Sequence, residues 1–116
     1  MNVIFLYLSQ NFDWSFLREF FDKVISPDKP TVIMGDVNWH YPEKHPMKEY
    51  LQMRDFAQMV RRATHMEGRI IDHLYTSNHY KDVEFPFDQQ STPYSDHDML
   101  TAYVPSSLHS NKSLNG

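Results

Sequence analysis

The chain has 116 residues, the length of one domain or of part of one. Hydrophobic residues make up 41% of it and aromatic residues 15%, which is enough for a packed core and excludes a disordered chain. The net charge of -4 excludes a protein that holds polyanions by charge alone, and the lack of cysteine excludes disulfides and thiolate metal sites. The apolar run at 3–8 is too short for a signal peptide or a membrane span, so we expect a soluble, intracellular protein with no membrane association.

The first third of the chain predicts a strand, a helix and a second strand. The apolar run at 3–8 is typical of a buried strand, and Asp13 is a candidate N-cap for a helix that ends before Pro27. A second strand is expected at 31–34, and the order strand, helix, strand predicts that the two strands are parallel. The helix carries apolar residues at helical spacing, all of which we expect in the core: Phe16, Leu17, Phe20, Phe21, Val24 and Ile25.

The rest of the chain predicts a second helix followed by short strands and loops. Pro46 suits the first position of a helix, with Met47, Tyr50 and Leu51 facing inward. Residues 55–63 fit either a continued helix or a strand. The further elements expected are a turn at 64–68, a strand at 69–76, a loop at 77–82, a short strand at 83–87, a polar loop at 89–98, a last strand at 99–104 and a disordered tail at 106–116.

Acidic side chains gather beside three of the predicted strands. Loops at strand ends are where α/β sheets usually bind ligands, and carboxylates at one rim repel each other unless a cation sits among them. A histidine beside an aspartate is held in one tautomer or charged. The pattern indicates metal-assisted hydrolysis of a phosphoester, in which one aspartate activates water and a histidine stabilises developing charge. The clusters are Asp36 with Asn38, Asp72 with His73, and Asp96 with His97 and Asp98.

Three short motifs occur in the order Gly35-Asp36-Val37-Asn38, Ile71-Asp72-His73 and Ser95-Asp96-His97-Asp98. Together they resemble the later motifs of the endonuclease/exonuclease/phosphatase superfamily, which has the DNase I-like fold. Thr64-His65 before the second motif and Tyr94 before the third agree with the resemblance, and endonuclease domains of mobile elements look nearest. The resemblance implies an α/β fold at 1–105, a partial DNase I-like sandwich with about half of the two-sheet, helix-flanked domain.

The resemblance also implies a role for each site residue. Asp36 would orient or deprotonate the attacking water, and Asn38 would hold the phosphate and the water. Asp96 would bind Mg²⁺ or Mn²⁺, with Asp36 as a further candidate ligand. His97 would contact the scissile phosphate and stabilise the transition state, and Asp72 would orient His97. DNA would be the substrate of the intact domain.

The chain departs from the family because it matches only the second half of the domain. The family's earlier half carries a metal-binding glutamate on a separate strand, and no glutamate here matches that motif. We therefore expect the isolated chain to be inactive and a partner chain to supply the missing half. Two other interpretations stay open, a non-enzymatic remnant or binding half-domain, and a phosphatase acting on small or lipid phosphoesters. Half of a sandwich is also expected to leave an apolar sheet face uncovered.

The remaining polar and aromatic residues have simpler interpretations. His73 is interpreted as a packing or surface residue, because it points to the opposite face of its strand from Asp72. Trp39 could stack on a nucleic-acid base or cap the core. Arg61, Arg62 and Arg69 could line a phosphate, although a solvated surface is the simpler reading. No zinc-ligand spacing relates the other histidines, which are interpreted as surface residues: His40, His45, His65, His79 and His109.

Overall fold

The computed structural model describes residues 1–93 and 95–104. The disordered tail expected at 106–116 and the Tyr94 that accompanies the third motif lie outside the described residues. The elements, in chain order, are β1 (Asn2–Tyr7), α1 (Trp14–Val24), β2 (Thr31–Asp36), α2 (Pro46–Met53), β3 (Ala57–Gln58), β4 (Asp72–Thr76), a 3₁₀ helix (Asn78–Tyr80), β5 (Phe87–Gln90) and β6 (Met99–Ala102).

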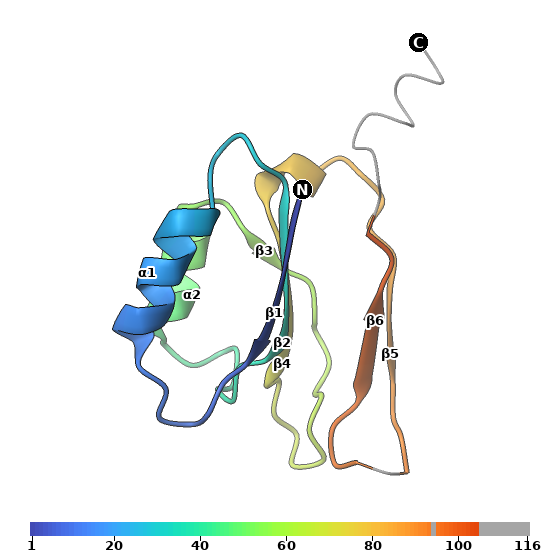
Figure 1. Ribbon diagram of the computed structural model, residues 1–116. Helices are drawn as coiled ribbons and strands as arrows, with labels where there is room; N and C mark the ends of the chain where they lie inside the picture. Colours follow the sequence, from blue (N-terminus) through green and yellow to red (C-terminus); the bar gives the residue numbers. More distant parts are fainter. Residues whose placement is uncertain (94, 105–116) are drawn as a thin grey trace.

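Two sheets form the frame of the molecule. The larger sheet has four strands in the order β1-β2-β4-β3, and β5 pairs with β6 in a separate two-stranded sheet. β1 and β2 are parallel, as the strand-helix-strand order predicts, whereas β4 is antiparallel to both β2 and β3. Helices α1 and α2 cover one face of the larger sheet, and the β5–β6 hairpin lies against the other (Figure 1). The described residues therefore form a mixed α/β fold with two sheets and two α-helices.

The first half of strand β2 is buried on both faces because the helices cover one face of the larger sheet and the hairpin covers the other. Val32 joins a cluster with Leu74 on the hairpin side. Ile33 joins a second cluster on the helix side, with Phe21 and Leu51. All of these side chains are at most 1% exposed. A strand covered on both faces shows a continuous apolar run rather than alternation, which is the pattern that identifies it in the sequence.

Helix α1 begins as predicted but buries less of its apolar surface. The Asp13 carboxylate accepts hydrogen bonds from the Ser15 backbone N–H at 3.0 Å and the Ser15 hydroxyl at 2.6 Å, which caps the helix. Phe21 is fully buried, but Phe16 is 75% exposed and Phe20 45%. The expectation that Phe16 and Phe20 belong to the core is wrong. Successive helical residues are rotated by about 100°, and only the side that carries Phe21 packs on the sheet.

The second half of the chain differs from expectation in its strands. Residues 55–63 contain strand β3, and the strand expected at 69–76 begins only at Asp72. The short strand expected at 83–87 is wrong, because β5 begins at Phe87 and runs into the segment expected to be a polar loop. Phe87 is the only apolar residue of β5, so the sequence of β5 lacks the hydrophobic pattern of a strand. The strand is held in place by its backbone pairing with β6.

His73 is a buried packing residue, as one of its two interpretations predicts. Its Nε2 lies 2.8 Å from the Ile70 carbonyl and its Nδ1 lies 2.9 Å from the Tyr75 hydroxyl, so one ring nitrogen donates and the other accepts. Trp39 meets the His73 ring edge-on and stacks on His45 at a centroid distance of 4.2 Å. Trp39 is 7% exposed and therefore caps the core rather than offering a surface for a base.

His73 makes the stability of the fold depend on pH. Burial lowers the pKa of His73 from 6.5 to about 4. The unfolded chain therefore takes up this proton at a higher pH than the folded one, and stability falls as the pH falls below about 6.5. We predict a loss of about 2 kcal/mol in the free energy of unfolding between pH 7 and pH 5 from this group. Urea unfolding at a series of pH values measures it.

The control for the predicted pH dependence is a substitution of His79, a histidine outside the core. The His73→Leu variant is expected to show a slope of stability against pH that is shallower than that of the wild type, whereas His79→Leu is expected to keep the wild-type slope. Identical slopes for wild type and His73→Leu between pH 7 and pH 5 would contradict the assignment of the pH dependence to His73.

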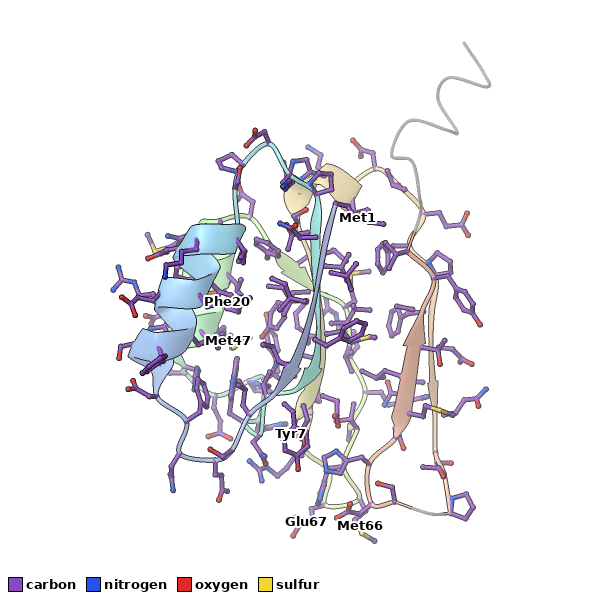
Figure 2. All side chains as sticks on the ribbon, viewed as in Figure 1. Met1, Tyr7, Phe20, Met47, Met66 and Glu67 are labelled. Carbon is purple, nitrogen blue, oxygen red and sulfur yellow. The ribbon has the colours of Figure 1, made fainter. Side chains whose placement is uncertain are left out.

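One face of edge strand β1 is apolar and uncovered. Val3 is 42% exposed, Phe5 71% and Tyr7 85%. Val3 pairs with Val32 of β2, so these side chains share the sheet face on which the hairpin packs. The hairpin covers Val32 but leaves β1 exposed, and Figure 2 shows Tyr7 at the lower end of the sheet. An apolar patch on an edge strand favours association with another chain.

We predict that the isolated chain self-associates or aggregates through β1. Replacing Phe5 and Tyr7 together by threonine keeps strand propensity and removes the aromatic surface, so the double variant is expected to shift toward monomer. Size-exclusion chromatography with light scattering measures the shift. The matched control is Phe16→Thr, which removes an equally exposed aromatic residue from α1 and is expected to leave association unchanged. A monodisperse wild-type monomer that melts cooperatively would contradict the prediction.

Candidate functional site

Two aspartates face each other at one end of the larger sheet. Asp36 is the last residue of β2 and Asp72 the first residue of β4, and the antiparallel register makes them direct cross-strand partners. Their side chains are only 15% and 14% exposed. Burial raises the pKa of Asp36, and the negative charge of Asp72 raises it further. Like charges placed opposite each other in a sheet are destabilising, so this pair is costly for the fold.

His97 lies between the two aspartates and a third. Its Nδ1 is 2.8 Å from Asp72 Oδ2, a charge-assisted hydrogen bond in which the ring donates. Its Nε2 is 3.9 Å from Asp36 Oδ2 and 3.9 Å from Asp96 Oδ1. Partial burial alone would lower the pKa of His97, but the hydrogen bond and charge of Asp72, with the charges of Asp36 and Asp96, raise it overall. The imidazole therefore favours its charged form, with Nε2–H among the carboxylates.

Two residues with unusual backbone conformations lie at the end of β2 and in the turn that follows it. Gly35 has a φ of 150°, and a Cβ there would lie 1.9 Å from the Leu6 carbonyl oxygen of the neighbouring strand. Only glycine allows this approach of the two strands. Asn38 adopts a left-handed conformation with a φ of 60°. Its backbone N–H donates to Asp36 Oδ1 at 2.9 Å, and its Nδ2 donates to the Leu8 carbonyl at 2.7 Å. The turn thus fixes the direction of the Asp36 carboxylate.

Thr64 connects the start of β4 to the segment that carries His97. Its Oγ1 accepts hydrogen bonds from the backbone N–H groups of Ile71 at 3.1 Å and Asp72 at 3.0 Å. Its carbonyl accepts a bond of 2.6 Å from the backbone N–H of Asp98. The acid on β4 and the histidine on the loop before β6 are therefore placed relative to each other by one residue.

Asp96 and His65 complete the cluster on its solvent side. The Asp96 side chain is 52% exposed, and its Oδ2 lies 3.1 Å from His65 Nε2. The His65 side chain is only 13% exposed, so the interpretation of His65 as a surface residue is wrong. A signal was present, because Thr64-His65 precedes the Asp72 motif, but no spacing within one segment shows that His65 reaches Asp96.

The structure thus brings together Asp36, Asp72, Asp96 and His97, with Asn38 beside them, as the sequence predicts. The carboxyl end of β2 contributes Asp36 as expected, whereas Asp72 comes from the amino end of its strand because β4 runs antiparallel. Among the described residues, two groups of side chains have ligand atoms within 4.8 Å of one another and could hold a metal ion: Asp36, Asp72 and His97, and His65, Asp96 and His97.

Three other candidate residues hydrogen-bond to strands β3 and β5 and do not take part in the site. Asp98 Oδ2 accepts a hydrogen bond of 2.8 Å from Gln89 Nε2, although the sequence places Asp98 within the third motif. Arg62 donates to the Gln89 carbonyl at 2.6 Å, and Arg61 donates to the carbonyl of Gln58. These contacts fasten β5 and β3 to the neighbouring segments. They give Arg61 and Arg62 structural partners in place of the phosphate strip considered for them.

Comparisons with known proteins add no assignment. No known family, no curated protein and no solved structure matches the chain. Among the described residues, no helix has the length and apolar character needed to cross a membrane. The functional argument therefore rests on the geometry of the site.

We predict that the Asp36→Asn substitution stabilises the fold. The raised pKa of Asp36 means that its ionisation costs stability, and this cost is complete once the pH exceeds the pKa of the folded carboxyl. Asparagine removes the charge and keeps an oxygen that can accept from the Asn38 backbone N–H. We expect a gain of about 1 kcal/mol in the free energy of unfolding at pH 7 in metal-free buffer.

The matched control is the exposed Asp82, where the Asp82→Asn substitution should change the free energy of unfolding by less than about 0.5 kcal/mol. Chemical denaturation of the three proteins in the presence of a chelator provides the comparison. Equal or lower stability of Asp36→Asn relative to wild type would show that the facing carboxylates are not under strain.

Proposed function

We propose that this chain carries the water-activating and phosphate-binding side of a metal-dependent phosphodiesterase site of the nuclease type. The observation that carries the proposal is the convergence of Asp36, Asp72, Asp96 and His97, from three separate segments of the chain, at one end of the larger sheet. Structural ion pairs do not require three carboxylates around one imidazole. The pKa values of Asp36 and His97 are both raised, and a cluster that contains titratable groups with shifted pKa values is typical of catalytic sites.

His97 would stabilise negative charge on the phosphoryl group. Its Nδ1–H is fixed by Asp72, which orients the ring and leaves Nε2–H as the donor that faces the other carboxylates. The raised pKa keeps the ring charged at neutral pH more than an ordinary histidine. A fixed, charged donor of this kind stabilises charge that develops in a transition state, because it needs no reorganisation at the moment of reaction.

Asp36 would orient and deprotonate the attacking water. Its raised pKa makes it a stronger base than an ordinary aspartate, which favours proton transfer near neutral pH. One carboxylate oxygen is held by the Asn38 backbone N–H, and the other faces His97. Asn38 donates one Nδ2 hydrogen to Leu8, and an amide nitrogen has a second one that a phosphate oxygen could accept.

The donor set suits a hard divalent cation such as Mg²⁺ or Mn²⁺. Asp36 and Asp96 supply carboxylate oxygens on either side of His97, in two separate groups whose ligand atoms lie within 4.8 Å of one another, and hard cations prefer oxygen ligands. When bound, such an ion would polarise a phosphoryl oxygen and offset the repulsion between the acids. Asp96 is the main candidate ligand, with Asp36 as a second. Two carboxylates alone leave much of the ion's coordination to water, substrate or a partner.

A partner chain is proposed to complete the site. Tyr7, the last residue of the exposed edge strand, is the register partner of Asp36. A polypeptide that covered Val3, Phe5 and Tyr7 would therefore end next to the proposed water-activating aspartate and could supply a further carboxylate ligand. A partner in this position would make hydrolysis a property of the completed site, for which DNA is the proposed substrate, and not of the isolated chain. A binding half-domain without catalysis is the second candidate, favoured by the same uncovered face.

Calorimetric titration of the isolated chain with Mn²⁺ tests the metal half of the proposal. The wild type is expected to bind, and Asp96→Asn and Asp36→Asn are each expected to weaken binding because each removes a charged oxygen ligand. Asp98→Asn is the matched control, since Asp98 is an acid beside the motif whose carboxylate serves the hairpin. Failure of the wild type to bind Mn²⁺ more tightly than the Asp96→Asn, Asp36→Asn double variant would contradict the proposal.

The second readout is turnover of plasmid and abasic DNA with Mg²⁺ or Mn²⁺. We expect no cleavage by the isolated chain, because its own ligands hold the ion incompletely. Cleavage that is abolished by Asp36→Ala and by His97→Ala would show that these residues act without a partner, and would overturn the requirement for one. Hydrolysis of a small phosphomonoester in place of DNA would identify a phosphatase.

A further inference from the structure

His65 forms a contact at the site that no sequence motif assigns. Its Nε2 lies 3.1 Å from Asp96 Oδ2, and its ring meets the His97 ring edge-on, with centroids 5.0 Å apart and planes at 88°. The side chain belongs to the segment between β3 and β4, whereas Asp96 and His97 belong to the segment before β6. His65 thus adds a fourth segment of the chain to the cluster, after β2, β4 and the β5–β6 loop.

The backbone holds His65 and Asp96 in fixed relation. His65 and His97 form an isolated antiparallel bridge, and the Met66 N–H donates to the Asp96 carbonyl at 2.9 Å. Figure 2 shows Met66 and Glu67 at the tip of the loop that this segment forms, at the same end of the molecule as Tyr7. The two side chains are therefore placed by paired backbone, and their contact does not depend on the chance meeting of two flexible loops.

The hydrogen bonds of the ring assign its roles. The Glu67 backbone N–H lies 3.2 Å from His65 Nδ1 and donates to it, and the Glu67 carboxylate oxygen Oε1 lies 3.4 Å from the same nitrogen. A neutral ring that accepts at Nδ1 carries its proton at Nε2, and a charged ring carries a proton on both nitrogens, so Nε2 is protonated in either form. Nε2 then donates to Asp96. The same atom cannot at once donate to Asp96 and offer a lone pair to a metal ion, so this geometry favours a role for His65 behind Asp96 over direct metal binding.

We propose that His65 is a positioning residue, whose Nε2–H bond to Oδ2 holds the Asp96 carboxylate so that Oδ1 faces His97 and the ion. The inference rests on the proposed function, because it assigns His65 a task in that metal site. Asp96 needs such support, since its side chain is 52% exposed. Partners that hydrogen-bond a metal ligand fix its orientation, and losing one typically weakens metal affinity by about 10- to 100-fold.

Titration of the full chain with Mn²⁺, monitored by electron paramagnetic resonance, tests the inference. His65→Ala is expected to weaken Mn²⁺ binding by about tenfold. His65→Gln keeps a side-chain N–H donor at a similar reach and is expected to restore affinity to within about threefold of wild type. His79→Ala, at the opposite end of β4, is the control and should bind as the wild type does. Circular dichroism melting of each variant checks that it is folded.

The outcomes separate this inference from the proposed function. Wild-type affinity in His65→Ala, together with lost affinity in Asp96→Asn, would overturn the positioning role and leave the metal site standing. Equal losses in His65→Gln and His65→Ala would also overturn it, because they would identify His65 as a direct ligand. No Mn²⁺ binding by the wild type would overturn the metal site itself. A ring N–H resonance of His65 that is protected from exchange, and is lost in Asp96→Ala, would support the hydrogen bond without any metal.

Discussion

The antiparallel pairing of β2 with β4 is the constraint on which the candidate site depends. It sets Asp36 directly opposite Asp72 at one end of a sheet whose interior is apolar. Two partly buried acids in this position repel, and the fold accepts the cost with His97 held between them. Gly35 permits the close approach of β1 to β2 beside Asp36, and Thr64 anchors the start of β4. The elements that deviate from regular structure therefore surround the acids.

The sequence predicts the interior of the larger sheet better than it predicts the hairpin that packs against this sheet. The run that contains Val32 and Ile33 predicts β2, and Asp36 and Asp72 were candidates because acidic side chains gather beside the strands predicted there. Hairpin strand β5 could not be predicted, because pairing with β6 rather than apolar content gives it order. The contact of His65 with Asp96 joins residues 31 positions apart, so it exists only in the folded chain.

The uncovered face of β1 and the site belong to one physical picture. Phe5 and Tyr7 would cost solubility in a chain that acts alone, yet the strand that carries them ends beside Asp36. A second polypeptide on this face would bury the aromatic residues and bring new side chains to the acids. One partner chain would then both cover the exposed apolar edge and complete the set of oxygen ligands.

Anomalous diffraction from crystals of the chain soaked with Mn²⁺ tests the central claim most directly. We predict a strong anomalous peak within about 2.1 Å of an Asp96 carboxylate oxygen and beside His97 Nε2. The hydrogen bond from His97 to Asp72 should persist with the ion bound. A peak elsewhere on the surface, or none at this end of the sheet, would contradict the assignment of these residues to a metal-dependent phosphodiesterase site.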